Sequence, residues 1–262
     1  MGRLGEPAAP STALEAALRR DRWLVALGLL AVVALAWLYL WREAAAAHSP
    51  MAMGMSGMPA MDAGGVALVF AMWLVMMAGM MLPGAAPMVL LYGAMVRKHS
   101  ERGSVLPAVW IFVSGYLLVW AGFSLAAALL QALLDRAALL SPTMTSSSQP
   151  LSALLLAAAG VYQLTPLKDR CLRHCREPVQ FLMTHWRPGP AGALRMGLEH
   201  GAYCVGCCSM LMLLLFAVGV MNLAWVAAIA AFVLVEKLLP GARFTSRFAG
   251  AALLVLAGTM LL

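Results

Sequence analysis

Long runs of apolar residues alternate with short polar segments along this chain of 262 residues. The runs occupy residues 23–41, 66–95, 105–134, 151–167, 193–220, 223–239 and 248–262. About 20 consecutive apolar residues are needed for a helix to cross the hydrocarbon core of a bilayer. The last run is marginal by this measure. The pattern predicts an all-α fold, a polytopic transmembrane helix bundle of about seven spans.

The same pattern divides the chain into four parts. A polar, basic segment covers residues 1–22, a first transmembrane helix 23–41, a Met-rich loop 42–65, and a membrane domain 66–262. A signal peptide is the alternative for the first apolar run, because small residues follow it. The run is longer than the apolar stretch of about 7–15 residues in a signal peptide, so we expect a retained helix.

Composition and charge support the membrane assignment. The chain is 63% hydrophobic and 11% charged, with a mean hydropathy of +0.86, which a soluble domain of this length would not have. The net charge of +7 is confined to short segments between the apolar runs, so we expect it to set topology and predict no nucleic-acid partner. With a cytoplasmic N-terminus, 16 of the 18 Lys and Arg residues fall inside, including Lys168 and Lys237.

All five cysteines fall in two short segments on the predicted cytoplasmic side. Cys171, His174 and Cys175 follow the fourth apolar run, whereas four further candidates open the fifth: His200, Cys204, Cys207 and Cys208. At about 100° per residue, the first three of these four fall within an arc of about 60°, and Cys208 lies about 40° beyond Cys204. Consecutive spans are usually neighbours, which predicts one shared site.

Thiolates and imidazoles are ligands for soft and borderline metals, which makes these residues a candidate metal site. Cu(I) is the ion we expect, and zinc or iron are the alternatives. Two other interpretations stay open, since free cysteines often pack in helix cores and thiols also exchange disulfides. An odd number of cysteines argues against a simple disulfide framework.

Methionines form a second pattern. The predicted outside loop carries five of them, Met51, Met53, Met55, Met58 and Met61. Thioethers are soft and uncharged, which suits capture of Cu(I) or Ag(I) in an oxidising compartment. The next apolar run contains Met72, Met76 and Met80 at i, i+4 and i+8, which places them on one side of a helix. Met77 and Met81 form a neighbouring stripe. Such methionine stripes more often belong to a packed hydrophobic core than to a binding site. Pro83 then marks a kink or a break, and broken helices line sites in many transporters.

Several strings resemble a bacterial family of predicted metal-binding integral membrane proteins of unknown function. They are MWLVMMAGMMLP (72–83), YQLTPLKDRCLRHC (162–175), HGAYCVGCC (200–208), GVMN (219–222) and EKLLPG (236–241). The resemblance covers about residues 66 to 258. It implies a multi-pass protein of the bacterial inner membrane, a metal site in the cysteine motifs, and a small soluble companion protein.

These patterns lead to one hypothesis and two alternatives. The hypothesis is a copper-homeostasis protein that transfers or transports Cu(I) between the outer Met-rich loop and the inner Cys/His site, with no catalytic residues. The alternatives are a membrane redox enzyme that uses its thiols, and a structural subunit of a larger membrane assembly that uses the metal site as a staple.

Overall fold

The computed structural model describes residues 12–47, 63–99, 104–139, 148–239 and 242–261. Within these ranges all regular secondary structure is helical, which confirms the predicted all-α class. The helices in chain order are α1 (Thr12–Ala47), α3 (Ala63–His99), α4 (Leu106–Arg136), α5 (Gln149–Gln163), α6 (Pro166–Arg176), α7 (Pro178–His185), α8 (Gly189–Leu213), α9 (Leu215–Val218), α10 (Leu223–Leu238) and α11 (Ala242–Leu261).

Each predicted apolar run coincides with at least one helix. Five stretches are long and apolar enough to cross a membrane, namely Leu18–Ala46, Gly64–Lys98, Leu106–Arg136, Gly189–Val218 and Arg243–Leu261. The bent pair α5 and α6 adds a sixth if it is counted as one span, and α10 has 16 residues. Several membrane-spanning candidates are thus present, while the count of seven spans and the cytoplasmic N-terminus stay predictions.

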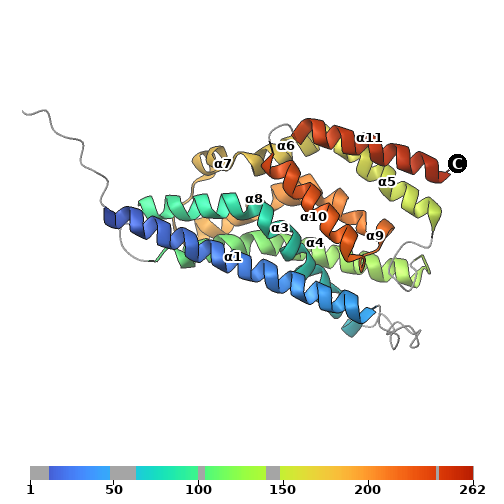
Figure 1. The fold of residues 1–262 in the computed structure, drawn as a ribbon, viewed down its shortest axis with the longest axis horizontal. Helices are drawn as coiled ribbons and strands as arrows, with labels where there is room; N and C mark the ends of the chain where they lie inside the picture. The colour runs from blue at the N-terminus through green and yellow to red at the C-terminus, as the bar shows by residue number, and fades with distance from the viewer. Residues whose placement is uncertain (1–11, 48–62, 100–103, 140–147, 240–241, 262) are drawn as a thin grey trace, which may run out of the picture.

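Successive long helices run in alternate directions (Figure 1). Three of the basic residues assigned to the inner side are nevertheless buried. Arg97 of α3, Lys168 of α6 and Lys237 of α10 are 8%, 0% and 5% exposed. Buried basic residues do not act as surface charges that set topology, so these three residues do not support the predicted orientation.

The fourth predicted span ends earlier than the apolar pattern indicates. α5 stops at Gln163 and α6 begins at Pro166, with a bend of 66° between them. The Thr165 hydroxyl accepts a hydrogen bond from the Lys168 backbone N–H at 3.4 Å and so caps the new helix. Proline in the first turn fits a helix start. The bend lets α6 pack against α8 and brings Cys175 to that helix.

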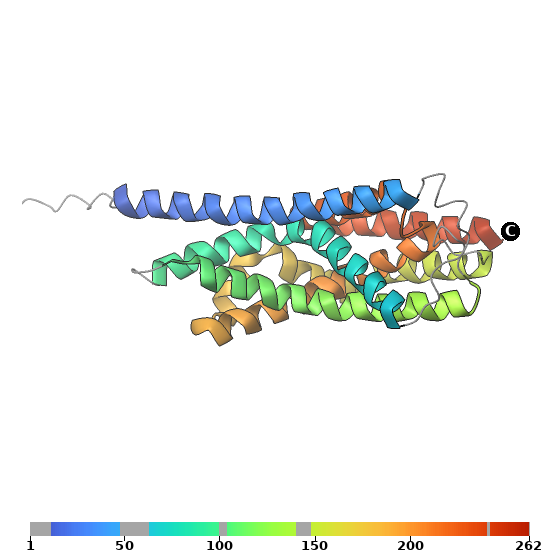
Figure 2. The same cartoon turned by 90° about the horizontal axis from the view of Figure 1, so that it is seen from below.

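Helix α3 is kinked and not broken. It runs without interruption from Ala63 to His99 and contains Pro83 and Pro87. Figure 2 shows that α3 changes direction along its length. Proline removes a backbone hydrogen bond and clashes with the preceding turn, which accounts for such a bend.

Helices α4 and α8 pack closely through small residues. A Cβ atom added to Gly197 would lie well inside van der Waals contact with the Phe112 carbonyl oxygen. One added to Gly115 would collide in the same way with the Leu194 carbonyl oxygen. Small residues allow helix backbones in a membrane to approach closely. The close approach fixes the rotation of α8, so its cysteines face the interior of the bundle.

Candidate metal site

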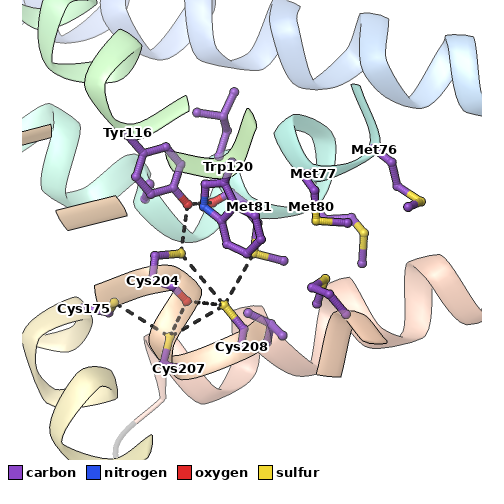
Figure 3. Close-up of a cluster of buried hydrophobic side chains, with 14 of the residues drawn as sticks. Met76, Met77, Met80, Met81, Tyr116, Trp120, Cys175, Cys204, Cys207 and Cys208 are labelled. Carbon is purple, nitrogen blue, oxygen red and sulfur yellow. Dashed lines mark hydrogen bonds between the residues drawn. The ribbon is translucent and has the colours of Figure 1, made fainter. Parts of the chain in front are cut away.

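Three cysteines of α8 form the centre of a buried group of sulfur atoms. Cys204, Cys207 and Cys208 are each at most 2% exposed, and Figure 3 shows them side by side. The Cys208 Sγ atom lies 3.7 Å from the Cys207 Sγ atom and 3.9 Å from the Cys204 Sγ atom. The predicted helical phase had placed these residues on one side of the helix, and in the structure that side is buried.

Helix α6 supplies a fourth buried cysteine. The Cys175 Sγ atom lies 3.9 Å from the Cys207 Sγ atom. Cys171, one turn earlier, is half-buried, and its sulfur packs against the backbone of α8, because a Cβ atom added to Gly206 would lie 2.8 Å from it. The two cysteine segments, separated by about 30 residues in the chain, therefore meet in space.

A methionine of α3 completes the group. The Cys208 thiol faces the Met81 thioether, with 3.8 Å between the two sulfur atoms. We call Cys175, Cys204, Cys207, Cys208 and Met81 the sulfur cluster. It joins helices that are far apart in the sequence, since α3, α6 and α8 each contribute at least one member.

The sulfur cluster is a chain of neighbouring pairs. Among the residues that the structure describes, no three or more His, Cys, Asp or Glu side chains are arranged to hold one metal ion. Two sulfur atoms that bind one ion at about 2.3 Å each lie at most about 4.6 Å apart. The pairs here are 3.7–3.9 Å apart, within the reach of a single ion. Soft sulfur donors are the ligands that Cu(I) prefers.

Two polar groups from other helices reach Cys204. The Lys237 ammonium group of α10 donates to the Cys204 Sγ atom at 2.9 Å. The Tyr116 hydroxyl of α4 lies 3.1 Å from the same sulfur and 3.2 Å from the Met81 carbonyl oxygen, to which it donates. Both side chains are buried. Cys204 thus has a positively charged neighbour, and the other cysteines of the cluster have sulfur neighbours.

The two predicted histidine ligands lie in different surroundings. His174 is half-buried on α6, where its ring stacks on that of Tyr203 at a centroid distance of 4.0 Å and its Nδ1 atom lies 2.9 Å from the Arg170 carbonyl oxygen. It lines a surface cavity of about 210 Å³ together with residues such as Gln180. The structure thus places His174 on the outer side of α6, where it contacts Tyr203 and the Arg170 carbonyl oxygen.

His200 lies inside the protein, next to the sulfur cluster. Its ring packs against the rings of Tyr116, Phe181 and Phe112, at centroid distances of 5.7, 5.6 and 6.2 Å. Its Nδ1 atom is buried and has no hydrogen-bond partner among the described residues. Tyr116 connects the two features, since it contacts both this ring and the Cys204 sulfur.

The methionine stripe of α3 is buried along its length. Met72, Met76 and Met80 are 6%, 1% and 3% exposed, and Figure 3 shows Met76, Met77 and Met80 following Met81 away from the cysteines. Met72 and Met76 also line a small cavity with Glu43 of α1 and Met221. The predicted loop ligands Met51, Met53, Met55, Met58 and Met61 lie outside the described residues.

A model of the copper chaperone family, PpoB2, matches residues 70–260. The chain belongs to this family. The match includes every member of the sulfur cluster, as well as Tyr116 and Lys237. A comparison with curated proteins and one with solved structures each found no match. Family membership confirms the expectation of a copper-related protein.

Three residues in or beside the sulfur cluster of this copper chaperone family member were not predicted from the sequence. Met81 was placed in the secondary stripe, whereas in the structure it is the methionine that contacts a cysteine. Lys237 was counted among the basic residues of the inner side, and Tyr116 was not considered. The signal available for Lys237 was its position inside the EKLLPG string that carries the resemblance. No signal in a single sequence identifies Tyr116, because nothing distinguishes it from other aromatic residues in an apolar run.

Proposed function

We propose that this multi-pass membrane protein binds Cu(I) on the sulfur cluster and transfers it by ligand exchange along the methionines of α3. The carrying observation is the continuity of sulfur atoms from Cys175 through Cys207 and Cys208 to Met81, with successive distances of 3.9, 3.7 and 3.8 Å. An ion held by one pair is already within reach of the next sulfur. Membership of the copper chaperone family supports copper as the cargo.

The direction and endpoints of transfer belong to the same proposal. In a bacterial inner membrane with the N-terminus in the cytoplasm, Met51 to Met61 would face the periplasm and bind Cu(I) first. Met72, Met76 and Met80 would pass the ion to the cysteines near the cytoplasmic side. Thioethers bind Cu(I) where thiols would oxidise, and thiolates bind it more strongly, so ligand strength increases along this path. Cys171 and His174, nearer the surface of α6, are the groups we expect to meet a soluble partner protein.

Copper binding is tested on the full chain, purified in detergent under anaerobic and reducing conditions and loaded with Cu(I). We expect stoichiometric uptake by metal analysis, and an X-ray absorption spectrum dominated by sulfur ligands. The double variant Cys207→Ser with Cys208→Ser removes the two central sulfurs and should abolish most of the uptake. Met183→Leu is the matched control, because Met183 is 74% exposed on α7. Absence of Cu(I) uptake by the unaltered protein would refute the proposal.

Transfer is tested separately in sealed vesicles that contain the protein. We expect Cu(I) or Ag(I) to cross the membrane, and crossing should slow when Met76 and Met80 are both replaced by leucine. Binding without any crossing would favour the structural-subunit alternative. Interconversion of the thiols between two oxidation states in protein that takes up no metal would favour the redox alternative.

A further inference from the structure

Lys237 is an unusual neighbour for a metal-binding cysteine. Its Nζ atom lies 2.9 Å from the Cys204 Sγ atom, and the residue is 5% exposed. Burial of an ammonium group is costly unless it is paired and hydrogen-bonded. The partner that the geometry supplies is the Cys204 sulfur, which the Tyr116 hydroxyl also approaches, at 3.1 Å. The lysine therefore belongs to the metal centre and not to the lipid or solvent surface.

Helix α3 has a space that fits this lysine. A Cβ atom added to Gly84 would lie 2.9 Å from the Lys237 Cδ atom and 3.4 Å from its Nζ atom. The side chain of Lys237 thus crosses α3 where the helix has no side chain of its own, one residue after Pro83. A larger residue at position 84 would push the ammonium group away from Cys204.

The neighbouring carboxylate is already engaged. Glu236 accepts hydrogen bonds from the Lys168 ammonium group at 2.6 and 2.8 Å and from the Ser246 hydroxyl at 2.6 Å. Lys168 and Glu236 balance each other, and Lys237 adds one positive charge to the sulfur cluster. The charge of the site thus differs by one unit from that of a cluster made of sulfur ligands alone.

We propose that Lys237 is a fixed counter-charge that makes the sulfur cluster selective for monovalent soft ions, Cu(I) and Ag(I), over divalent ions such as Zn(II). The inference rests on the proposed function, because it concerns the same cluster. The repulsion between the ammonium group and a bound ion grows in proportion to the charge of the ion. One Cu(I), the Cys204 and Cys208 thiolates, whose sulfur atoms lie 3.9 Å apart, and the Lys237 ammonium group sum to zero net charge. A divalent ion in the same place leaves a buried positive charge, which is unfavourable.

The number of available ligands also favours Cu(I) and Ag(I) over Zn(II). Structural Zn(II) sites are almost always tetrahedral, with four protein ligands. Here the ammonium group occupies one side of Cys204. An ion shared by Cys204 and Cys208 has Met81 beside Cys208 as a third sulfur ligand, while the Cys207 thiol donates to the Cys204 carbonyl oxygen. Such a site suits an ion that accepts two or three sulfur ligands. Lys237 thereby acts as a positioning and selectivity residue, and it does not itself bind the metal.

The test compares the unaltered protein with Lys237→Gln, Lys237→Arg and the control Lys98→Gln, which changes an exposed lysine of α3. The probes are Cu(I), measured by competition with a chromophoric Cu(I) chelator, and Zn(II), measured by competition with a zinc indicator. We expect the ratio of Cu(I) to Zn(II) affinity to fall about tenfold or more in Lys237→Gln, because the repulsion that penalises the divalent ion is gone. Lys237→Arg and Lys98→Gln should keep most of the ratio.

The outcomes separate the two proposals. If the unaltered protein takes up no Cu(I), the proposed function fails. If it takes up Cu(I) and Lys237→Gln leaves the affinity ratio unchanged, the counter-charge inference alone is overturned. Should Lys237→Gln not be recovered in folded form, the unaltered protein still decides, since stoichiometric Zn(II) binding that protects Cys204, Cys207 and Cys208 from alkylation would overturn the inference.

Discussion

Two buried lysines of this protein differ in the group that balances their charge. Lys168 of α6 meets a carboxylate, that of Glu236, which also accepts a hydrogen bond from Ser246 of α11. Lys237 of α10 meets the Cys204 sulfur instead. Glu236 and Lys237 are adjacent in sequence, and adjacent helical residues point about 100° apart, so each faces a different neighbour.

The two lysine contacts therefore have different expected roles, one in stability and the other in metal binding. The Lys168–Glu236 pair is closed, because each charge has its partner and a hydroxyl fills a further position. It ties α6, α10 and α11 together. In the Lys237–Cys204 contact, the sulfur can also bind a metal ion, because it is a ligand that soft metals prefer. Changes to the first contact should therefore alter stability, and changes to the second should alter metal binding.

The largest effect is expected from Glu236→Gln. The substitution leaves the Lys168 ammonium group buried without its counter-charge, which should cost about 3–5 kcal/mol of stability. Thermal unfolding of the purified protein in detergent measures the loss, with Glu43→Gln, an exposed change on α1, as the control. The double variant Lys168→Leu with Glu236→Gln should recover part of the stability. Equal unfolding temperatures for Glu236→Gln and Glu43→Gln would show that the Lys168–Glu236 pair does not stabilise the fold.

A smaller effect is expected from Gly84→Ala. The added methyl group meets the Lys237 side chain at 2.9 Å, and overpacking of this kind costs about 1–3 kcal/mol. Combining it with Lys237→Ala removes the collision, so the two substitutions should be clearly non-additive in a double-mutant cycle. Additive changes in the unfolding temperature would show that Lys237 does not cross α3 at this glycine.

Met81→Leu should separate binding from stability. Leucine has a similar volume, so the expected loss of stability is below about 1.5 kcal/mol. Loss of the thioether beside Cys208 should lower Cu(I) affinity by about tenfold, or about 1.4 kcal/mol. Chelator competition measures the affinity, and Met183→Leu serves as the exposed control. Unchanged affinity would exclude Met81 from the binding site.

The smallest effect is expected from Tyr116→Phe. The hydroxyl contributes contacts of 3.1 Å to the Cys204 sulfur and 3.2 Å to the Met81 carbonyl oxygen, and a hydrogen bond of this kind is worth about 1 kcal/mol. We expect a drop of that size in unfolding free energy, with Cu(I) stoichiometry kept. Loss of Cu(I) stoichiometry in this variant would show that Tyr116 is required to hold Cys204 in its binding position.

The sequence determined the helices and the candidate ligands of this protein. The apolar runs predicted the helices, because run length and polarity are local properties. Helical phase predicted that His200, Cys204, Cys207 and Cys208 lie toward one side, and all four are buried. The cysteine strings led to a metal-related family, and the matched family is one of copper chaperones.

The tertiary structure decided which of these residues meet. Periodicity tells which residues share a side of a helix, but not which way that side is turned relative to the neighbouring helices. Met81 and not Met80 reaches Cys208 because of the way α3 is turned where it packs on α4 and α10. Lys237 reaches Cys204 because Gly84 leaves space for it. Both outcomes depend on contacts between residues more than 30 positions apart, which no local pattern in the sequence encodes.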